Sequence, residues 1–166
     1  MASRSRARST SRSREGRVVS TPTAIEHRTR PSVLLTASAG CVGLIVRLAL
    51  RTARFNHVVA AVRWLAGTTR RDATPEQVMR VLHVVDAGAS WVPVRIACLE
   101  RSLTAVVLLA AGRRGVTWQI GVRTPPLTVH AWLVDATTGD PIGEPSTTAA
   151  YRPLITISAS TIRTGS

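Results

Sequence analysis

The sequence predicts an α+β fold in which helices come first and an antiparallel sheet follows. Apolar residues repeat at helical spacing from residue 34 to about residue 110, and from residue 116 onward they alternate with polar residues, as they do in strands. With 166 residues, 45% of them hydrophobic, the chain has the material for a single core. Helices and strands segregated in this way are typical of α+β proteins.

The charge divides the chain into parts. The net charge of +13 comes from 22 arginines without a lysine, and residues 1–30 carry +6 of it. We expect residues 1–20 to be a disordered Arg/Ser-rich tail, residues 21–158 one domain with its helical part at 31–88, and 159–166 a C-terminal tail. Nucleic-acid binding is the alternative for the tail, but no aromatic residue interleaves its arginines, so we favour a solvated extension.

The first helix is expected over about residues 34–53. Arg47, Arg51 and Arg54 recur on one face of it, which indicates an amphipathic core helix. The uncharged run at 33–46 is shorter than the about 20 residues that a bilayer requires, and its small-residue triplet lies inside the run. We therefore expect no stable membrane insertion and a cytoplasmic location. Cys41, in this apolar run, is expected to be structural.

Three more helices follow. The spacing of Phe55 to Leu65 predicts the second, with Gly67 as its stop. The third starts at Thr74-Pro75-Glu76-Gln77, with Thr74 as N-cap and Gln77 completing a capping box, and it ends near Gly88. The fourth begins near Cys98 and ends at Gly112.

A strand is predicted over 116–123, and Thr124-Pro125-Pro126 ends it. A second strand is predicted over 127–134, followed by a turn at 137–140. A third strand is expected to begin at 141–143, and residues 151–157 supply a last one. No internal repeat is visible.

Composition excludes several classes of site. Two cysteines cannot build a disulfide scaffold or a cysteine zinc site, and four histidines disfavour a structural metal, so we expect no metal and no cofactor. One Tyr, one Phe and four Trp are too few for a stacking platform. We therefore expect no nucleic acid as partner.

Cys98 and His130 are the candidate reactive residues. A helix N-terminus favours a thiolate at Cys98, and its backbone N–H is a candidate oxyanion donor. His130 lies in the middle of a predicted strand and can deprotonate the thiol if the sheet packs on that helix. A carboxylate is then needed to fix the imidazole tautomer, and Asp135, Asp140 and Glu144 all follow within reach.

The chain resembles the leader peptidases of lasso-peptide biosynthesis, which have a transglutaminase-like cysteine-protease domain. The likeness is carried by 98–103 (CLERSL), 120–126 (IGVRTPP), 130–132 (HAW), 142–145 (IGEP) and 151–154 (YRPL), and it extends to about residues 21–157. It implies a transglutaminase/papain-like core at 89–158, with a Cys-bearing helix packed on an antiparallel sheet. It also implies a cysteine peptidase that removes the leader of a ribosomally made precursor before a partner cyclase closes the macrolactam.

By this resemblance Cys98 is the nucleophile, His130 the base and Glu144 the acid, with Asp140 and Asp135 as substitutes. The hairpin at 136–139 is longer than is usual in that family. Trp132 shares a face with His130 and either walls the site or packs in the core. The implied partners are the precursor peptide, a separate leader-recognition protein and the lasso cyclase. A transglutaminase-like amidase or acyltransferase, and a non-catalytic basic binding module, are the alternatives.

Overall fold

The computed structural model describes residues 33–89 and 97–159. The chain divides into two units, Met1–Arg30 and Pro31–Ser166, and every described residue lies in the second. The tail predicted at 1–20 lies outside the described residues, and so does the C-terminal tail beyond Ala159.

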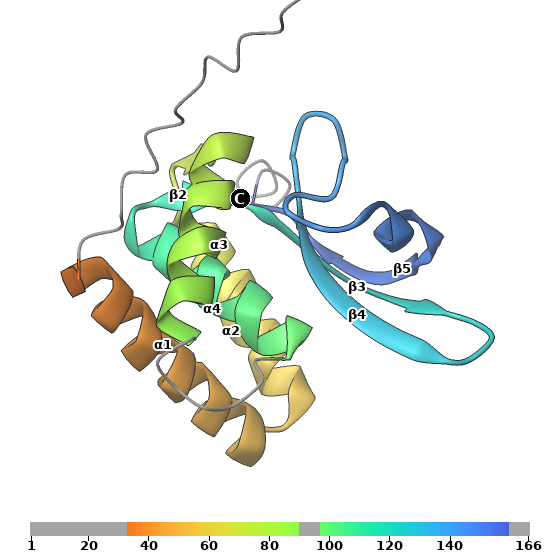
Figure 1. Ribbon diagram of the computed structural model, residues 1–166, viewed down its shortest axis with the longest axis horizontal. Coiled ribbons are helices and arrows are strands. Elements are labelled where there is room, and N and C mark those ends of the chain that lie inside the picture. Colours follow the sequence, from red (N-terminus) through yellow and green to blue (C-terminus); the bar gives the residue numbers. More distant parts are fainter. Residues whose placement is uncertain (1–32, 90–96, 160–166) are drawn as a thin grey trace, which may run out of the picture. The chain divides into compact units, whose positions relative to one another are not determined.

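Four helices come before the three-stranded sheet in the chain, as predicted. They are α1 (Val33–Thr52), α2 (Phe55–Thr68), α3 (Pro75–Ala89) and α4 (Cys98–Ala111) (Figure 1). The predicted capping box opens α3: the Gln77 N–H donates to Thr74 Oγ1 (3.4 Å), and the Thr74 N–H donates to Gln77 Oε1 (3.2 Å). Gly112 caps α4 at its C-terminus, also as predicted.

The sheet follows the helices in the chain. Its central strand is β3 (Thr117–Arg123), with β4 (Thr128–Val134) and β5 (Arg152–Ile157) paired antiparallel on either side. The predicted α+β fold is therefore confirmed. A separate parallel pair, β1 (Arg71–Asp72) with β2 (Arg114–Gly115), was not predicted, because two-residue strands are too short to show a period of two.

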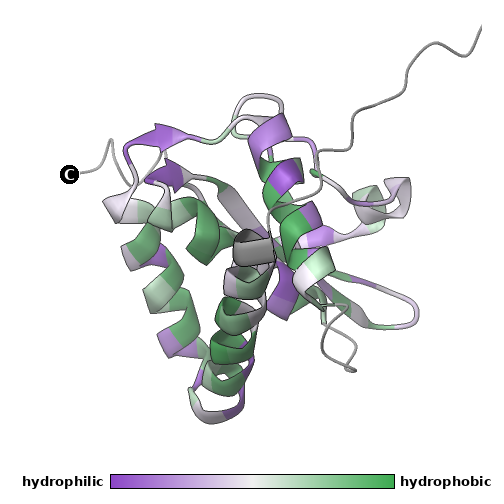
Figure 2. Ribbon diagram, turned by 60° about the vertical axis from the view of Figure 1, so that its left-hand side comes forward, coloured by the Kyte–Doolittle hydropathy of each residue, from purple (hydrophilic) through white to green (hydrophobic). Residues whose placement is uncertain are grey.

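The core lies between the helices and one face of this sheet. Trp118, Leu82, Leu133 and Val78 are among its fully buried side chains, and α4 packs against α1, α2, α3 and β4. Trp118 joins β3 to α4, since its Nε1–H donates to Ser102 Oγ (3.0 Å). Figure 2 shows the hydrophobic residues concentrated along the helices.

Three details differ from the prediction. No strand forms at 141–143: only Pro141 pairs with Val134, and the chain then turns through Gly143 (φ +68°) into the 3-10 helix η1 (Ser146–Ala150), because that backbone angle ends an extended run. Arg54 lies beyond the end of α1, so it does not extend the arginine face of that helix.

The third difference concerns the outer side of α1. Cys41, Leu44, Ile45 and Leu48 are exposed there, so the expected core helix buries only its other side. Within residues 33–89 and 97–159, no helix combines the length and the apolar character needed to cross a membrane.

Candidate active site

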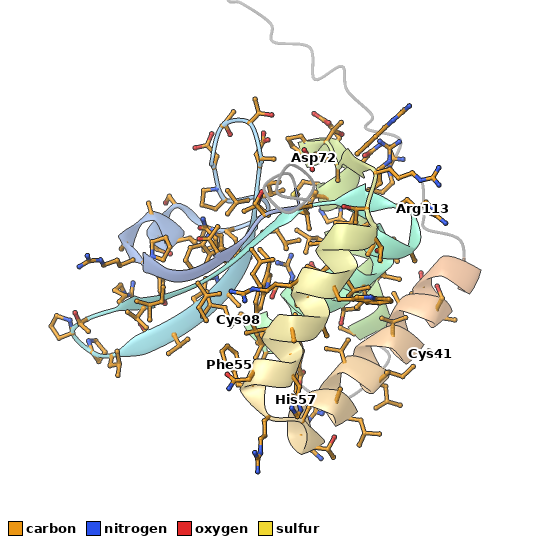
Figure 3. The ribbon with its side chains drawn as sticks, turned by 180° about the vertical axis from the view of Figure 1, so that it is seen from behind. Cys41, Phe55, His57, Asp72, Cys98 and Arg113 are labelled. Atoms are coloured by element: carbon orange, nitrogen blue, oxygen red, sulfur yellow. The ribbon has the colours of Figure 1, made fainter. Side chains whose placement is uncertain are left out.

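Cys98 is the first residue of α4, at the end of the helix that meets the strands (Figure 3). The preceding Ala97 has no side-chain acceptor, so only half of a capping box forms: Glu100 Oε2 accepts the Ala97 N–H (3.4 Å). The first N–H groups of a helix have no partner within the helix. The N-cap residue Ala97 makes no side-chain hydrogen bond to them, and the helix dipole favours negative charge near the half-buried Cys98.

His130, on β4, is paired with a carboxylate. Its Nε2 lies 2.8 Å from Glu144 Oε2, and the Glu144 side chain is 9% exposed. An ionised carboxylate only accepts hydrogen bonds, so this contact places the ring hydrogen of neutral His130 on Nε2 and leaves Nδ1 as the basic nitrogen. The contact with the carboxylate thus favours one imidazole tautomer.

Gly143 brings Glu144 to this position. It has a positive φ of +68°, and a Cβ there would lie 2.9 Å from Leu82 Cδ1 and 3.0 Å from Met79 Sδ on α3. Only glycine combines this backbone angle with so close an approach. The loop after β4 is therefore pressed onto α3, and the next residue is Glu144.

Aromatic rings hold the His130 imidazole. Trp132 stacks on it with the ring centroids 5.7 Å apart, and Tyr151 lies at 5.3 Å in a tilted arrangement. The Arg123 guanidinium in turn lies 5.1 Å from the Tyr151 ring centre. Trp132 is 3% exposed, so it both contacts His130 and is buried. The ring orientation of His130 is fixed by packing as well as by Glu144.

Arg101 joins the site to α3, which the sequence did not indicate. Its Nη1 donates to Glu144 Oε1 (3.1 Å), while Nε and Nη2 donate to the two oxygens of Asp86 (2.7 and 3.0 Å). The Asp86 carboxylate raises the pKa of Arg101, which therefore stays charged. Sequence offered one signal: Arg101 follows Cys98 by three residues and so lies on the same side of the helix.

The other candidate acids lie in the hairpin turn. Asp135 Oδ1 accepts the Thr137 N–H (2.8 Å), and the Asp140 N–H donates to Thr138 Oγ1 (3.2 Å). Within the described ranges, Glu144 is the carboxylate bonded to His130. The Cys98 Sγ makes no hydrogen bond with the described residues, and its link to the pair runs through the packing of α4 on β4 and through Arg101.

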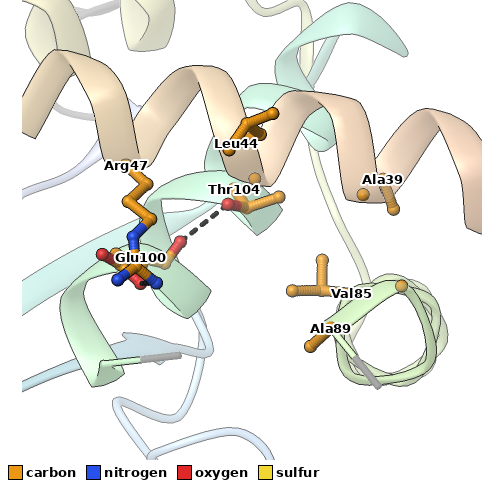
Figure 4. A pocket seen from close by; sticks show the side chains of 10 residues that line it. Ala39, Leu44, Arg47, Val85, Ala89, Glu100 and Thr104 are labelled. Carbon is orange, nitrogen blue, oxygen red and sulfur yellow. Dashed lines mark hydrogen bonds and ion pairs between the residues drawn. The ribbon is translucent and has the colours of Figure 1, made fainter. Parts of the chain in front are cut away.

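A shallow apolar groove lies elsewhere, between α1, α3 and α4 (Figure 4). Arg47 and Glu100 close one end of it with an ion pair of 3.9 Å. Cys98, His130 and Glu144 do not line this groove, so it is separate from the candidate site. Among the residues that the structure describes, no cluster of His, Cys, Asp and Glu side chains is placed to hold a metal ion.

The fold is α+β, with Cys98 at the start of a helix that packs on an antiparallel sheet carrying the His130–Glu144 pair. Cysteine, histidine and a carboxylate are the residue types that nucleophilic catalysis by a thiol requires. The family model of the transglutaminase-like superfamily matches residues 42–156, and the chain belongs to this superfamily. Its members are commonly cysteine-dependent enzymes. Neither the curated proteins nor the solved structures gave a match.

Proposed function

We propose that the protein is a cysteine peptidase that removes the leader from a lasso-peptide precursor, in the cytoplasm, before a partner cyclase forms the macrolactam. The observation that carries the chemistry is the 2.8 Å contact between His130 and Glu144 on a sheet packed against the helix that Cys98 begins. The superfamily match supports a thiol-dependent acyl transfer. The resemblance at 98–103, 120–126 and 142–145 supports the leader–core amide as the bond that is cut.

The first half of the reaction forms a thioester. Nδ1 of His130 takes the thiol proton, and the Cys98 thiolate attacks the carbonyl carbon of the leader–core amide. The backbone N–H of Cys98 receives the oxyanion, as a helix N-terminus can. His130 then gives its proton to the departing amine, so the core peptide leaves with a free N-terminus and the leader stays bound to sulfur.

Water completes the cycle. His130 takes a proton from water, hydroxide adds to the thioester carbonyl, and the C–S bond breaks to release the leader as a carboxylic acid and Cys98 as thiolate. Through both halves Glu144 stabilises the imidazolium at Nε2 and holds the ring in one orientation, as the acid of a triad does. Leader recognition is assigned to a separate small protein.

The test combines the protein with a lasso-precursor peptide and a leader-recognition protein and follows leader loss by mass spectrometry. Cys98→Ala and His130→Ala should abolish cleavage. Cys41→Ala is the matched control, since Cys41 is exposed on a different helix, and it should cleave at the normal rate. Cleavage that survives Cys98→Ala would refute the proposal.

The same measurement separates hydrolysis from transfer. A peptidase yields a leader fragment with a free carboxylate, whereas an acyltransferase yields a leader whose mass includes the added amine. Both pass through the same thioester. A leader–amine adduct in place of the free acid would assign the protein to the acyltransferases of its superfamily.

A further inference from the structure

We propose that Arg101 is a positioning residue of the active site, which holds the Glu144 carboxylate turned so that its Oε2 meets Nε2 of His130. This inference rests on the proposed function, since it concerns the same Cys98–His130–Glu144 site. It is carried by one guanidinium that bonds Asp86 with Nε and Nη2 and Glu144 with Nη1.

The geometry divides the two oxygens of Glu144 between two partners. Oε1 accepts from Arg101 at 3.1 Å, and Oε2 lies 2.8 Å from His130. A carboxylate bonded at both oxygens cannot rotate without losing a bond, so Arg101 limits Glu144 to the orientation that serves His130. At 9% exposure, Glu144 has little water to replace a lost partner.

Asp86 holds the guanidinium in turn. Two parallel bonds from one edge of Arg101 to both Asp86 oxygens fix the plane of the group, which is the bidentate arrangement that favours arginine over lysine. The position of Nη1 is therefore set by α3 and α4 before it reaches Glu144. A lysine, with a single ammonium, cannot keep all three bonds in this geometry.

Loss of Arg101 has an effect that a purely structural ion pair would not have. Without it Glu144 can turn away, and the His130 imidazolium loses its carboxylate. The thiolate–imidazolium pair then becomes less stable, and a higher pH is needed to ionise Cys98. Removal of the positive charge alone, with Glu144 in place, would favour the imidazolium and disfavour the thiolate, but it would leave the His130 tautomer unchanged.

The experiment measures two properties that need no peptide substrate. In a Cys41→Ala background Cys98 is the only thiol, and its alkylation rate by iodoacetamide against pH reports the thiolate. Nitrogen-15 NMR of the imidazoles reports the His130 tautomer, assigned by His130→Gln among the four histidines. For Arg101→Met we expect the alkylation of Cys98 at pH 6 to slow about 10-fold or more, which is the size of effect seen for outer partners that orient a functional side chain. We also expect the Nε2–H tautomer of His130 to lose its predominance.

Three further variants complete the design. Arg101→Lys should restore part of the alkylation rate of Cys98. If circular dichroism shows that Arg101→Met does not fold, Arg101→Lys replaces it as the test variant. Arg80→Met, which removes an exposed arginine on α3, should behave as the parent protein. In a Glu144→Gln background, Arg101→Met should change neither readout further, because Arg101 acts through Glu144.

Unchanged or faster alkylation in Arg101→Met with an intact tautomer would overturn the inference, and so would full additivity with Glu144→Gln. Failure of the proposed function is a different result. If no leader is cleaved while alkylation and tautomer respond as expected, Arg101 still positions the pair and only the substrate is wrong. If leader cleavage proceeds while Arg101→Met leaves both readouts unchanged, the peptidase assignment stands and Arg101 has no positioning role.

Discussion

His130 is constrained at three points of its ring. Glu144 meets Nε2, and the rings of Trp132 and Tyr151 lie against the imidazole. Trp132 packs this closely because β3 has a glycine opposite His130: a Cβ at Gly121 would lie 2.6 Å from Trp132 Cη2 and from the Arg152 carbonyl oxygen. In the proposed reaction, a base held in one orientation needs little reorganisation when it moves a proton.

The acid of the site is open to a direct test. We expect Glu144→Gln to lower kcat/KM about 10²-fold or more, because an amide that donates to Nε2 favours the wrong tautomer. Asp135→Asn and Asp140→Asn should stay within about threefold of the parent, since both side chains lie in the hairpin turn. Steady-state kinetics on a leader-bearing peptide checks all three. A larger loss in Asp140→Asn than in Glu144→Gln would move the acid to Asp140.

The sequence predicted some of the site residues and missed others. Residue types and spacing were enough to nominate Cys98, His130 and three possible acids, because each chemistry admits few side chains. They could not single out Glu144, since its approach depends on how Gly143 packs on α3. Arg101 was not among the predicted site residues, because nothing in one sequence shows that Asp86 and Glu144 converge on it from other elements.

At the scale of elements, local signals placed the helices well. The capping box at Thr74, the spacing of apolar residues and the stop at Gly112 are encoded within a few residues of each boundary. The strand expected at 141–143 was wrong because its fate depends on a long-range contact. Gly143 turns the chain toward Met79 and Leu82, and no local pattern announces that contact.

The cap of α3 has a measurable effect on stability. We expect Thr74→Ala to lower the free energy of unfolding by about 1 kcal/mol at neutral pH, since the Gln77 N–H loses its acceptor. Urea denaturation followed by circular dichroism measures it. Ser, a good N-cap, should retain most of the stability, so Thr74→Ser is the matched control.

The stabilisation that the Thr74 cap provides depends on pH. The hydrogen bond from Thr74 lowers the pKa of Glu76 below 4.5 in the folded protein. A lowered folded-state pKa stabilises the fold above the unfolded value, and this contribution disappears as the pH falls through the folded value. The difference in the free energy of unfolding between the parent protein and Thr74→Ala should therefore become smaller below about pH 4.5. A difference that widens on acidification would contradict the role of Thr74.

At the scale of the whole molecule, the order of the elements was predictable and their pairing was less so. Helical periods followed by a period of two indicated α+β, because segregated elements form separate layers. β4 follows β3 directly in the chain and pairs with it as a hairpin, whereas β5 comes later and pairs with the other edge of β3. One extra residue in β5, Leu154, is accommodated by an irregularity between Ile120 and Gly121. Such pairings are decided by tertiary packing.

The tail should be dispensable for the chemistry. The superfamily match begins at residue 42, and the residues of the site lie between Asp86 and Tyr151. We expect a chain without residues 1–20 to cleave the precursor with kcat/KM within about threefold of the full chain. Kinetics with and without the leader-recognition protein checks this. If the deletion lowers cleavage only in reactions that depend on the leader-recognition protein, the tail binds that protein.

The hairpin after β4 is closed at its neck. Asp135 N–H donates to the Asp140 carbonyl, the Ile142 N–H donates to the Leu133 carbonyl, and Pro141 pairs with Val134. The exposed tip at 136–139 therefore begins and ends at nearly the same place, whatever its length. Evolution can lengthen it, and an experimenter can insert an affinity tag or a fluorescent reporter there, without changing the distance between His130 and Glu144.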